Sequence, residues 1–183
     1  MTDTGVHSFE EKRMIEKHIH ETTSLKNRTI LRPCGFFETL LWDVMRKFMT
    51  TWRADVPIKL IGADDIGRIA AQCFERPDEF AGQTLEIAGD QLLPAQFSAV
   101  WEEVTGEKLV LEDPSIVPSF FKEMIVTMDK LSEQYGHPMI MLGDPNKTRA
   151  LFPFVKDLKA WLKGINVAKG NMAERPDFVA QNE

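Results

Sequence analysis

Short β-rich runs alternate with amphipathic helical segments along most of this chain, and this alternation limits the fold more than any other feature. Strands separated by helices of roughly 10–15 residues are typical of α/β domains, in which helices cross between parallel strands. The expected strands are residues 29–31, 57–61, 83–88 and 109–111. The expected helices are residues 9–22, 37–49, 66–74, 94–105, 115–135, 144–151 and 155–162. The pattern therefore predicts an α/β fold.

The first expected element is a helix, although a crossover helix needs a strand before it. The chain also has no G-x-G-x-x-G or G-x-x-G-x-x-G loop between a strand and a helix. In dinucleotide-binding domains such a loop, with the helix N-terminus behind it, holds the pyrophosphate of the cofactor. We therefore expect the C-terminal portion of such a domain, without the N-terminal half that grips the phosphates.

Composition and charge exclude several classes of function. The 183 residues carry a net charge of −6, and the basic residues are flanked by acids, which argues against direct nucleic acid binding. Cys34 and Cys73 are too few for a disulfide framework or a zinc set, and His18 and His20 point to different helix faces, so no metal site is expected. There is no signal peptide pattern and no apolar run of about 18 residues. We therefore expect no membrane contact and a cytoplasmic protein, with the nucleus as a second location.

Lys12 is a candidate for chemistry at a bound ligand. On a helical wheel it lies at the margin of the apolar stripe, so its stem can pack while its ammonium reaches a cleft. Its functional interpretation is a hydrogen bond to a ribose, which also lowers the pKa of a neighbouring acid. The alternative is an ordinary solvated lysine on a helix surface.

Pro33, Cys34, Gly35 and Phe36 form the expected turn after the strand at 29–31. Ligands of open α/β sheets bind beyond the carboxyl ends of strands, and a proline-glycine turn lets the backbone approach a flat ring closely. The alternative is a plain strand-to-helix turn.

Two further patterns favour structural roles. Asp64 and Asp65 look like a metal or acid/base pair, but they precede a helix that starts near Ile66, and we expect them to cap it. Tyr135 is not followed four residues later by a lysine, because residue 139 is Met, so no tyrosine–lysine acid pair is expected.

Five segments, taken in order, resemble one protein family. Residues Ser8 to Lys12, followed by Ile15-Glu16, are similar to an H-F-x-x-K…(I/V)-E segment. Residues 29–38 are similar to a T-x-L-R-P-x-x-F-x-E-N strand and turn. Residues 65–71 are similar to a D-I-G-x-x-A-A segment, and residues 82–97 to the strand, turn and helix that come next in the family. Residues 149–153 and 161–162 are similar to the closing segment of the family. The family is the NmrA-like family, atypical relatives of the short-chain dehydrogenases.

The resemblance implies a Rossmann-like domain that binds NADP or NAD, with a small, mostly helical lobe on the substrate side. It implies one partial NmrA-like domain over residues 1–166, which lacks the N-terminal nucleotide-binding half, and a flexible tail over residues 167–183. It also implies that Lys12, as the catalytic candidate, lies near the nicotinamide ribose. The turn at residues 33–36 would border the nicotinamide.

Two departures concern the ring-side hydrogen bonds. Ser8 stands where the family usually has histidine, and Thr39 stands where it usually has asparagine.

Members of the family are redox-sensing regulators or reductases. We expect a regulator of the redox-sensor type, truncated and with weak or no catalysis alone. The alternative is an NAD(P)H-dependent oxidoreductase that reduces small carbonyl or quinone compounds and whose N-terminal half is supplied elsewhere. A third hypothesis is a binding module, in which the apolar residues from Ile116 to Leu131 contact a protein partner or a second copy.

Overall fold

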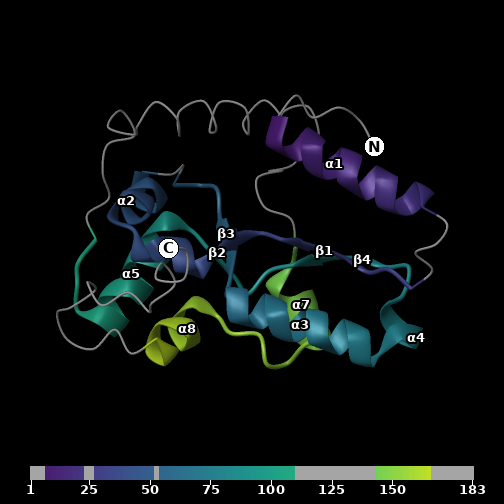
Figure 1. Ribbon diagram of the computed structural model, residues 1–183. Coiled ribbons are helices and arrows are strands. Elements are labelled where there is room, and N and C mark those ends of the chain that lie inside the picture. The colour runs from purple at the N-terminus through teal and green to yellow at the C-terminus, as the bar shows by residue number, and fades with distance from the viewer. Residues whose placement is uncertain (1–6, 23–26, 52–53, 110–142, 166–183) are drawn as a thin grey trace, which may run out of the picture.

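The computed structural model describes residues 7–22, 27–51, 54–109 and 143–165. Two strands lie between two helices in Figure 1, namely β1 (Ile30–Pro33) and β4 (Thr84–Ile87) between α1 (His7–Glu21) and α3 (Ala63–Glu75). Three further strands are β2 (Gly35–Phe36), β3 (Ile58–Ile61) and β5 (Asp90–Leu92). The helices beside them are η1 (Phe37–Leu41), α2 (Asp43–Thr51), α5 (Pro94–Thr105) and α8 (Leu158–Gly164). The fold is thus α/β, as the alternation predicts.

The β1–β4 pair is parallel, with Arg32 opposite Glu86. Successive side chains of a strand point to opposite faces. On β4, Leu85 and Ile87 are buried in the cluster that includes α3, whereas Thr84 and Glu86 are exposed on the other face. One face of the pair is therefore apolar and the other polar, although the parallel sheets of α/β domains are usually apolar on both faces.

Both segments of this pair change neighbours at their carboxyl ends. The N–H of Cys34 still donates to the carbonyl of Ile87 at 3.2 Å, and then β2 pairs in parallel with β3. The N–H of Gly89 donates to the carbonyl of Leu60 at 2.8 Å, and then β5 pairs antiparallel with β3. Strand β3 is therefore inserted where β1 and β4 separate, and the strand pairing is mixed rather than wholly parallel.

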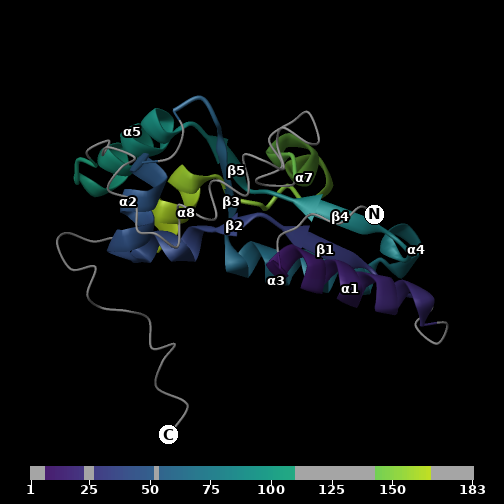
Figure 2. The same cartoon turned by 90° about the horizontal axis from the view of Figure 1, so that it is seen from above.

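Two clusters of buried side chains hold these parts together. One cluster joins α3 to the β1–β4 pair and includes Ile69, Phe80 and Phe152. The other joins η1, α2, β3, α5 and α8, and it centres on Trp101 and Phe37. Seen from above in Figure 2, the two parts lie side by side along the direction of the strands.

Two short helices complete the described part. Helix α4 (Pro77–Phe80) follows α3, and α7 (Pro145–Leu151) packs beside β4. The hydroxyl of Thr148 on α7 accepts a hydrogen bond from the N–H of Ala88 at 3.1 Å. Helix α7 therefore provides a hydrogen-bond partner for a backbone N–H just after the end of β4.

The helix expected over residues 37–49 is wrong, because it is two elements. The 3₁₀-helix η1 ends at Leu41, the backbone of Trp42 is extended, and α2 begins at Asp43. Arg46 is buried and donates to the carbonyl of Leu40 at 2.8 Å. This bond satisfies a carbonyl that the break leaves without a helical partner.

Asp65 does not cap α3, contrary to the expectation. Helix α3 begins at Ala63 without a side-chain cap. The carboxylate of Asp65 is buried and accepts a hydrogen bond from the N–H of Lys156 at 2.9 Å. It therefore fastens the segment before α8 to α3.

Other expectations lie outside the described residues. These are the strand residues 110–111, the helix at 115–135, its apolar surface from Ile116 to Leu131, and the tail at 167–183.

Candidate functional site

A charged clamp attaches α1 to the sheet, and we call it the Glu16–Arg32–Glu86 clamp. Arg32 Nε donates to Glu16 Oε1 at 2.9 Å, and Nη2 donates to Glu16 Oε2 at 2.5 Å. Its remaining nitrogen, Nη1, donates to Glu86 Oε1 at 3.3 Å. Two parallel bonds between a guanidinium and a carboxylate fix relative orientation as well as distance. The hydrogen bond from Arg32 lowers the pKa of the Glu16 carboxyl.

The clamp and a second contact fix the direction of α1. Glu16 is hydrogen-bonded to Arg32. One turn further along the helix, His20 lies 3.4 Å from Arg28, which comes four residues before Arg32. Helix α1 and strand β1 therefore run antiparallel, as Figure 1 shows.

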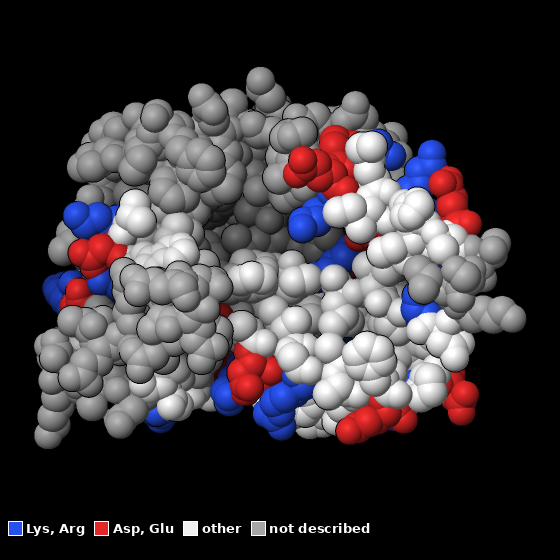
Figure 3. Space-filling model, viewed as in Figure 1, with Lys and Arg blue, Asp and Glu red and all other residues white. Residues whose placement is uncertain are grey.

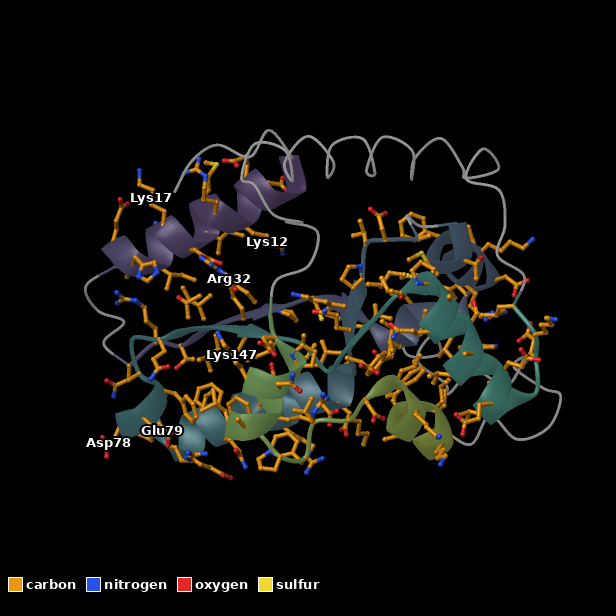
Figure 4. The ribbon with its side chains drawn as sticks, turned by 180° about the vertical axis from the view of Figure 1, so that it is seen from behind. Lys12, Lys17, Arg32, Asp78, Glu79 and Lys147 are labelled. Atoms are coloured by element: carbon orange, nitrogen blue, oxygen red, sulfur yellow. The ribbon has the colours of Figure 1, made fainter. Side chains whose placement is uncertain are left out.

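This direction determines where Lys12 lies. Lys12 precedes Glu16 by one helical turn, which displaces it by about 6 Å toward the carboxyl end of β1. Two residues of strand cover about 6–7 Å in the same direction, from Arg32 to Cys34. Figure 4 shows Lys12 on the side of α1 that faces the sheet, close to Arg32, with Lys17 on the outer side. Lys12 is thus about level with the start of the bend that follows β1, and its side chain is exposed.

The bend after β1 includes a short strand, whereas the sequence predicts a turn over residues 33–36. Pro33 ends β1, Cys34 links the two strands, and Gly35-Phe36 is strand β2. The Cys34 thiol is largely enclosed, and burial raises its pKa to about 12. Phe36 is exposed, so an aromatic ring stands at the surface of the bend.

Two side chains of η1 hold the bend in place. The hydroxyl of Thr39 donates to the carbonyl of Phe36 at 2.7 Å. Glu38 Oε1 accepts a hydrogen bond from the N–H of Ala63, the first residue of α3, at 2.9 Å. The other oxygen, Glu38 Oε2, is buried and has no hydrogen-bond partner within the described part of the chain. A buried acceptor without a partner is costly and is a suitable place for a ligand N–H or O–H.

Chemically, the bend offers an exposed aromatic ring and a buried carboxylate oxygen at the carboxyl end of a parallel strand pair, and Lys12 carries an ammonium on α1. The clamp ties the helix that carries Lys12 to the strand that leads into the bend at residues 33–36. Sequence reasoning missed the roles of Glu16, Arg32 and Glu86. The signal was available in part, because Glu16 and Arg32 both belong to the motif segments, but their pairing depends on the tertiary fold.

The surroundings of the site carry mixed charge. Lys and Arg are interspersed with Asp and Glu over the described surface in Figure 3. Within the described ranges there is no group of three or more side chains that could hold a metal ion. None of the helices described is both long and apolar enough to cross a membrane.

Comparisons with known proteins point to one family. A sequence model described as the NmrA-like family matches residues 2–162. The crystal structure of NmrA, a negative transcriptional regulator in complex with NADP, is similar with a TM-score of 0.59 at 15% identity, over 84% of this chain and 56% of that one. NmrA in complex with NAD gives a TM-score of 0.58 at 15% identity, with the same coverage of 84% and 56%. A search of curated proteins gave no match.

A further similar structure is a nucleoside-diphosphate-sugar epimerase from Staphylococcus aureus. It gives a TM-score of 0.58 at 16% identity, over 82% of this chain and 56% of that one. The chain thus spans just over half the length of these structures. Their likeness shows the Rossmann-like fold, and the sequence match covers most of the chain. The chain belongs to the NmrA-like family.

Proposed function

We propose that this chain is a regulator of the redox-sensor type that contacts the nicotinamide end of NADP or NAD and has weak or no catalysis alone. The observation that supports the proposal is the attachment of α1 to β1 through the Glu16–Arg32 hydrogen bonds, one helical turn from Lys12. Ligands of open α/β sheets bind at such carboxyl ends.

The residues present fit one end of the dinucleotide. The Lys12 ammonium would donate to a ribose hydroxyl, Phe36 would contact the nicotinamide ring, and Glu38 Oε2 would accept from the carboxamide. The bound dinucleotide would supply hydride chemistry. The residues do not fit the phosphates, because the chain has no glycine-rich loop that opens a helix. We therefore expect weak affinity.

Two of the reported similar structures support a regulator, while the third is named as an epimerase. Two of the similar structures are of NmrA, named as a negative transcriptional regulator, one with NADP and one with NAD. We extend that cofactor class to this chain as part of the proposal. A regulator acts through protein contacts, so we also propose a protein partner or self-association through exposed apolar side chains, in the cytoplasm or the nucleus.

Calorimetric titration of the purified chain with NADPH tests the proposal. We expect binding with a dissociation constant on the order of hundreds of micromolar, and about fivefold weaker binding for Lys12→Ala, because one hydrogen bond to a charged donor is lost. A far-UV circular dichroism spectrum shows that each variant is folded. A dissociation constant in the low micromolar range would contradict the weak grip on the phosphates. No binding at millimolar NADPH would contradict cofactor contact.

The second candidate is an NAD(P)H-dependent reductase of small carbonyl or quinone compounds whose other half is supplied elsewhere. The observation that favours it is the outer edge of β1. The N–H groups of Ile30 and Cys34 donate to the β4 segment, so the backbone of Leu31 faces away from β4. Within the described residues no strand pairs with that edge.

A supplied half would complete this sheet. Co-purification with a chain that carries a glycine-rich loop, followed by NADPH oxidation with a quinone, tests the idea. Oxidation by the complex and not by the chain alone would support it. A lack of any such companion, in purification or in the coding sequence upstream, would count against it.

A further inference from the structure

Within the described part of the chain, helix α1 packs no buried apolar face against the fold. None of its side chains that the structure describes belongs to either core cluster. Met14 and Ile15 are 63% and 55% exposed. Most helices of globular proteins gain their stability from packing an apolar face against a core. Among the described residues, the contacts that join α1 to the sheet are therefore polar.

The Glu16–Arg32–Glu86 clamp is suited to that role. Arg32 is three-quarters covered and joins carboxylates from two different elements, α1 and β4. Because Arg32 and Glu86 are opposite in the strand register, their side chains lie on the same, polar face of the pair. The planar guanidinium can serve both carboxylates at once, whereas an ammonium is a single point charge.

The clamp also sets the register of α1 along β1. Slippage of the helix by one turn would move Lys12 by about 5 Å. That distance is enough to separate its ammonium from a ligand at the bend. Arg13, by contrast, pairs with Glu10 at 2.6 Å within α1 and makes no such link to the sheet.

We propose that Arg32 is a positioning residue: by clamping Glu16 against Glu86, it holds α1 in the register that places Lys12 at the nicotinamide end of the site. This inference rests on the proposed function, since it gives Lys12 its ligand. Arg32 and Glu16, which both belong to the family-like segments, would thus act together to position α1.

Amide hydrogen exchange of the full chain tests the clamp without any ligand. Arg32→Gln should speed the exchange of α1 amides by about five- to tenfold and leave β3 and α3 unchanged. Glu16→Gln should do the same from the helix side, where it cannot disturb β1. Arg32→Lys should restore part of the protection, and Arg13→Gln should leave it unchanged. Unaltered exchange in α1, or equal acceleration in α3, would overturn the proposal.

Ligand titration then tests whether the clamp acts through Lys12. The probes are NADPH and adenosine 2′,5′-bisphosphate, which lacks both the nicotinamide and its ribose. Arg32→Gln should weaken NADPH binding as much as Lys12→Ala does, the double variant should be no weaker than Lys12→Ala, and none of these variants should change the titration with adenosine 2′,5′-bisphosphate. Fully additive losses would show that Arg32 acts independently of Lys12 and would overturn the proposal.

Hydrogen exchange and ligand titration together distinguish a failure of the proposed function from a failure of the positioning role of Arg32. If the parent chain does not bind NADPH, the proposed function fails, while hydrogen exchange still decides whether Arg32 holds α1. If NADPH binds and depends on Lys12 but not on Arg32, the proposed function stands and the positioning role fails.

Discussion

At the scale of single residues, two neighbouring aspartates have different roles. Asp65 is 1% exposed and accepts the N–H of Lys156, whereas Asp64 is 74% exposed and lies 3.6 Å from the Lys156 ammonium. Loss of the first carboxylate leaves a partly buried N–H unpaired. Loss of the second removes one exposed ion pair, which contributes little.

We therefore predict that Asp65→Ala lowers the free energy of unfolding by about 1–3 kcal/mol. Asp64→Ala is the matched control and should change it by less than about 0.5 kcal/mol. Urea unfolding followed by circular dichroism measures both. Equal losses in the two variants would show that Asp65 acts only through the local charge of the helix start.

A second prediction concerns the Cys34 thiol. Burial raises its pKa to about 12, so at pH 8 only on the order of one thiol in ten thousand is ionised. Iodoacetamide at pH 8 should leave Cys34 of the folded chain unmodified, and should label it once urea is added, as mass spectrometry would report. Rapid labelling of the folded chain would contradict this burial.

The raised pKa of Cys34 also makes the stability of the fold depend on pH. The unfolded chain ionises this thiol near pH 9, before the folded chain does. Folding therefore loses stability as the pH rises from about 9 toward 12.

At the scale of elements, the sequence predicts helices well where caps and periodicity agree. Pro94 does start α5, and Gly106 ends it in the left-handed conformation. The break at Trp42 could not be predicted, because the apolar period continues through it and the cause is the tertiary contact of Arg46. Strand β5 is not among the expected strands, since Asp90-Gln91-Leu92 has low strand propensity and is ordered by pairing with β3.

The candidate site shows the same limit. Local patterns indicate Lys12 and the bend at residues 33–36 as separate features. What relates them is a pairing across 16 residues, from Glu16 to Arg32, which no local period contains.

The crossing of the chain from β4 to β5 gives an element-scale prediction. A Cβ on Gly89 would lie 2.7 Å from the carbonyl oxygen of Lys156 and 3.2 Å from Cα of Ile61, both of them backbone atoms. Gly89→Ala should therefore destabilise the chain by about 1–3 kcal/mol. Gly67, inside α3, has no heavy atom within 4 Å of such a Cβ, so Gly67→Ala should stabilise the chain by roughly 0.5–1 kcal/mol.

Thermal unfolding of the two variants measures these opposite changes. If Gly89→Ala leaves the melting temperature unaltered, the strands do not approach as closely as described. If Gly67→Ala destabilises the chain, α3 packs more tightly on that side than its open surroundings indicate.

At the scale of the whole molecule, the described residues cover the two faces of the β1–β4 pair differently. One face is covered by α3, whereas the other carries Thr84 and Glu86 in solvent under a helix that is held by charge. The related structures are nearly twice as long as the matched part. A charged attachment suits a helix whose position responds to a ligand, because it holds α1 in place without burying an apolar face.

Exposed apolar side chains give the last prediction. The 3₁₀-helix η1 ends at Leu41, and helix α2 begins at Asp43. Around this break the side chains of Leu41, Trp42 and Val44 are 37%, 57% and 44% exposed. Clustered apolar exposure favours association, while the net charge of −6 opposes it. We expect weak self-association that strengthens with salt, and at least about a tenfold higher dissociation constant for Trp42→Glu, in sedimentation velocity. Phe74→Glu, which alters a lone exposed ring on α3, is the control and should change nothing; a parent chain that stays monomeric at high concentration and high salt would contradict the prediction.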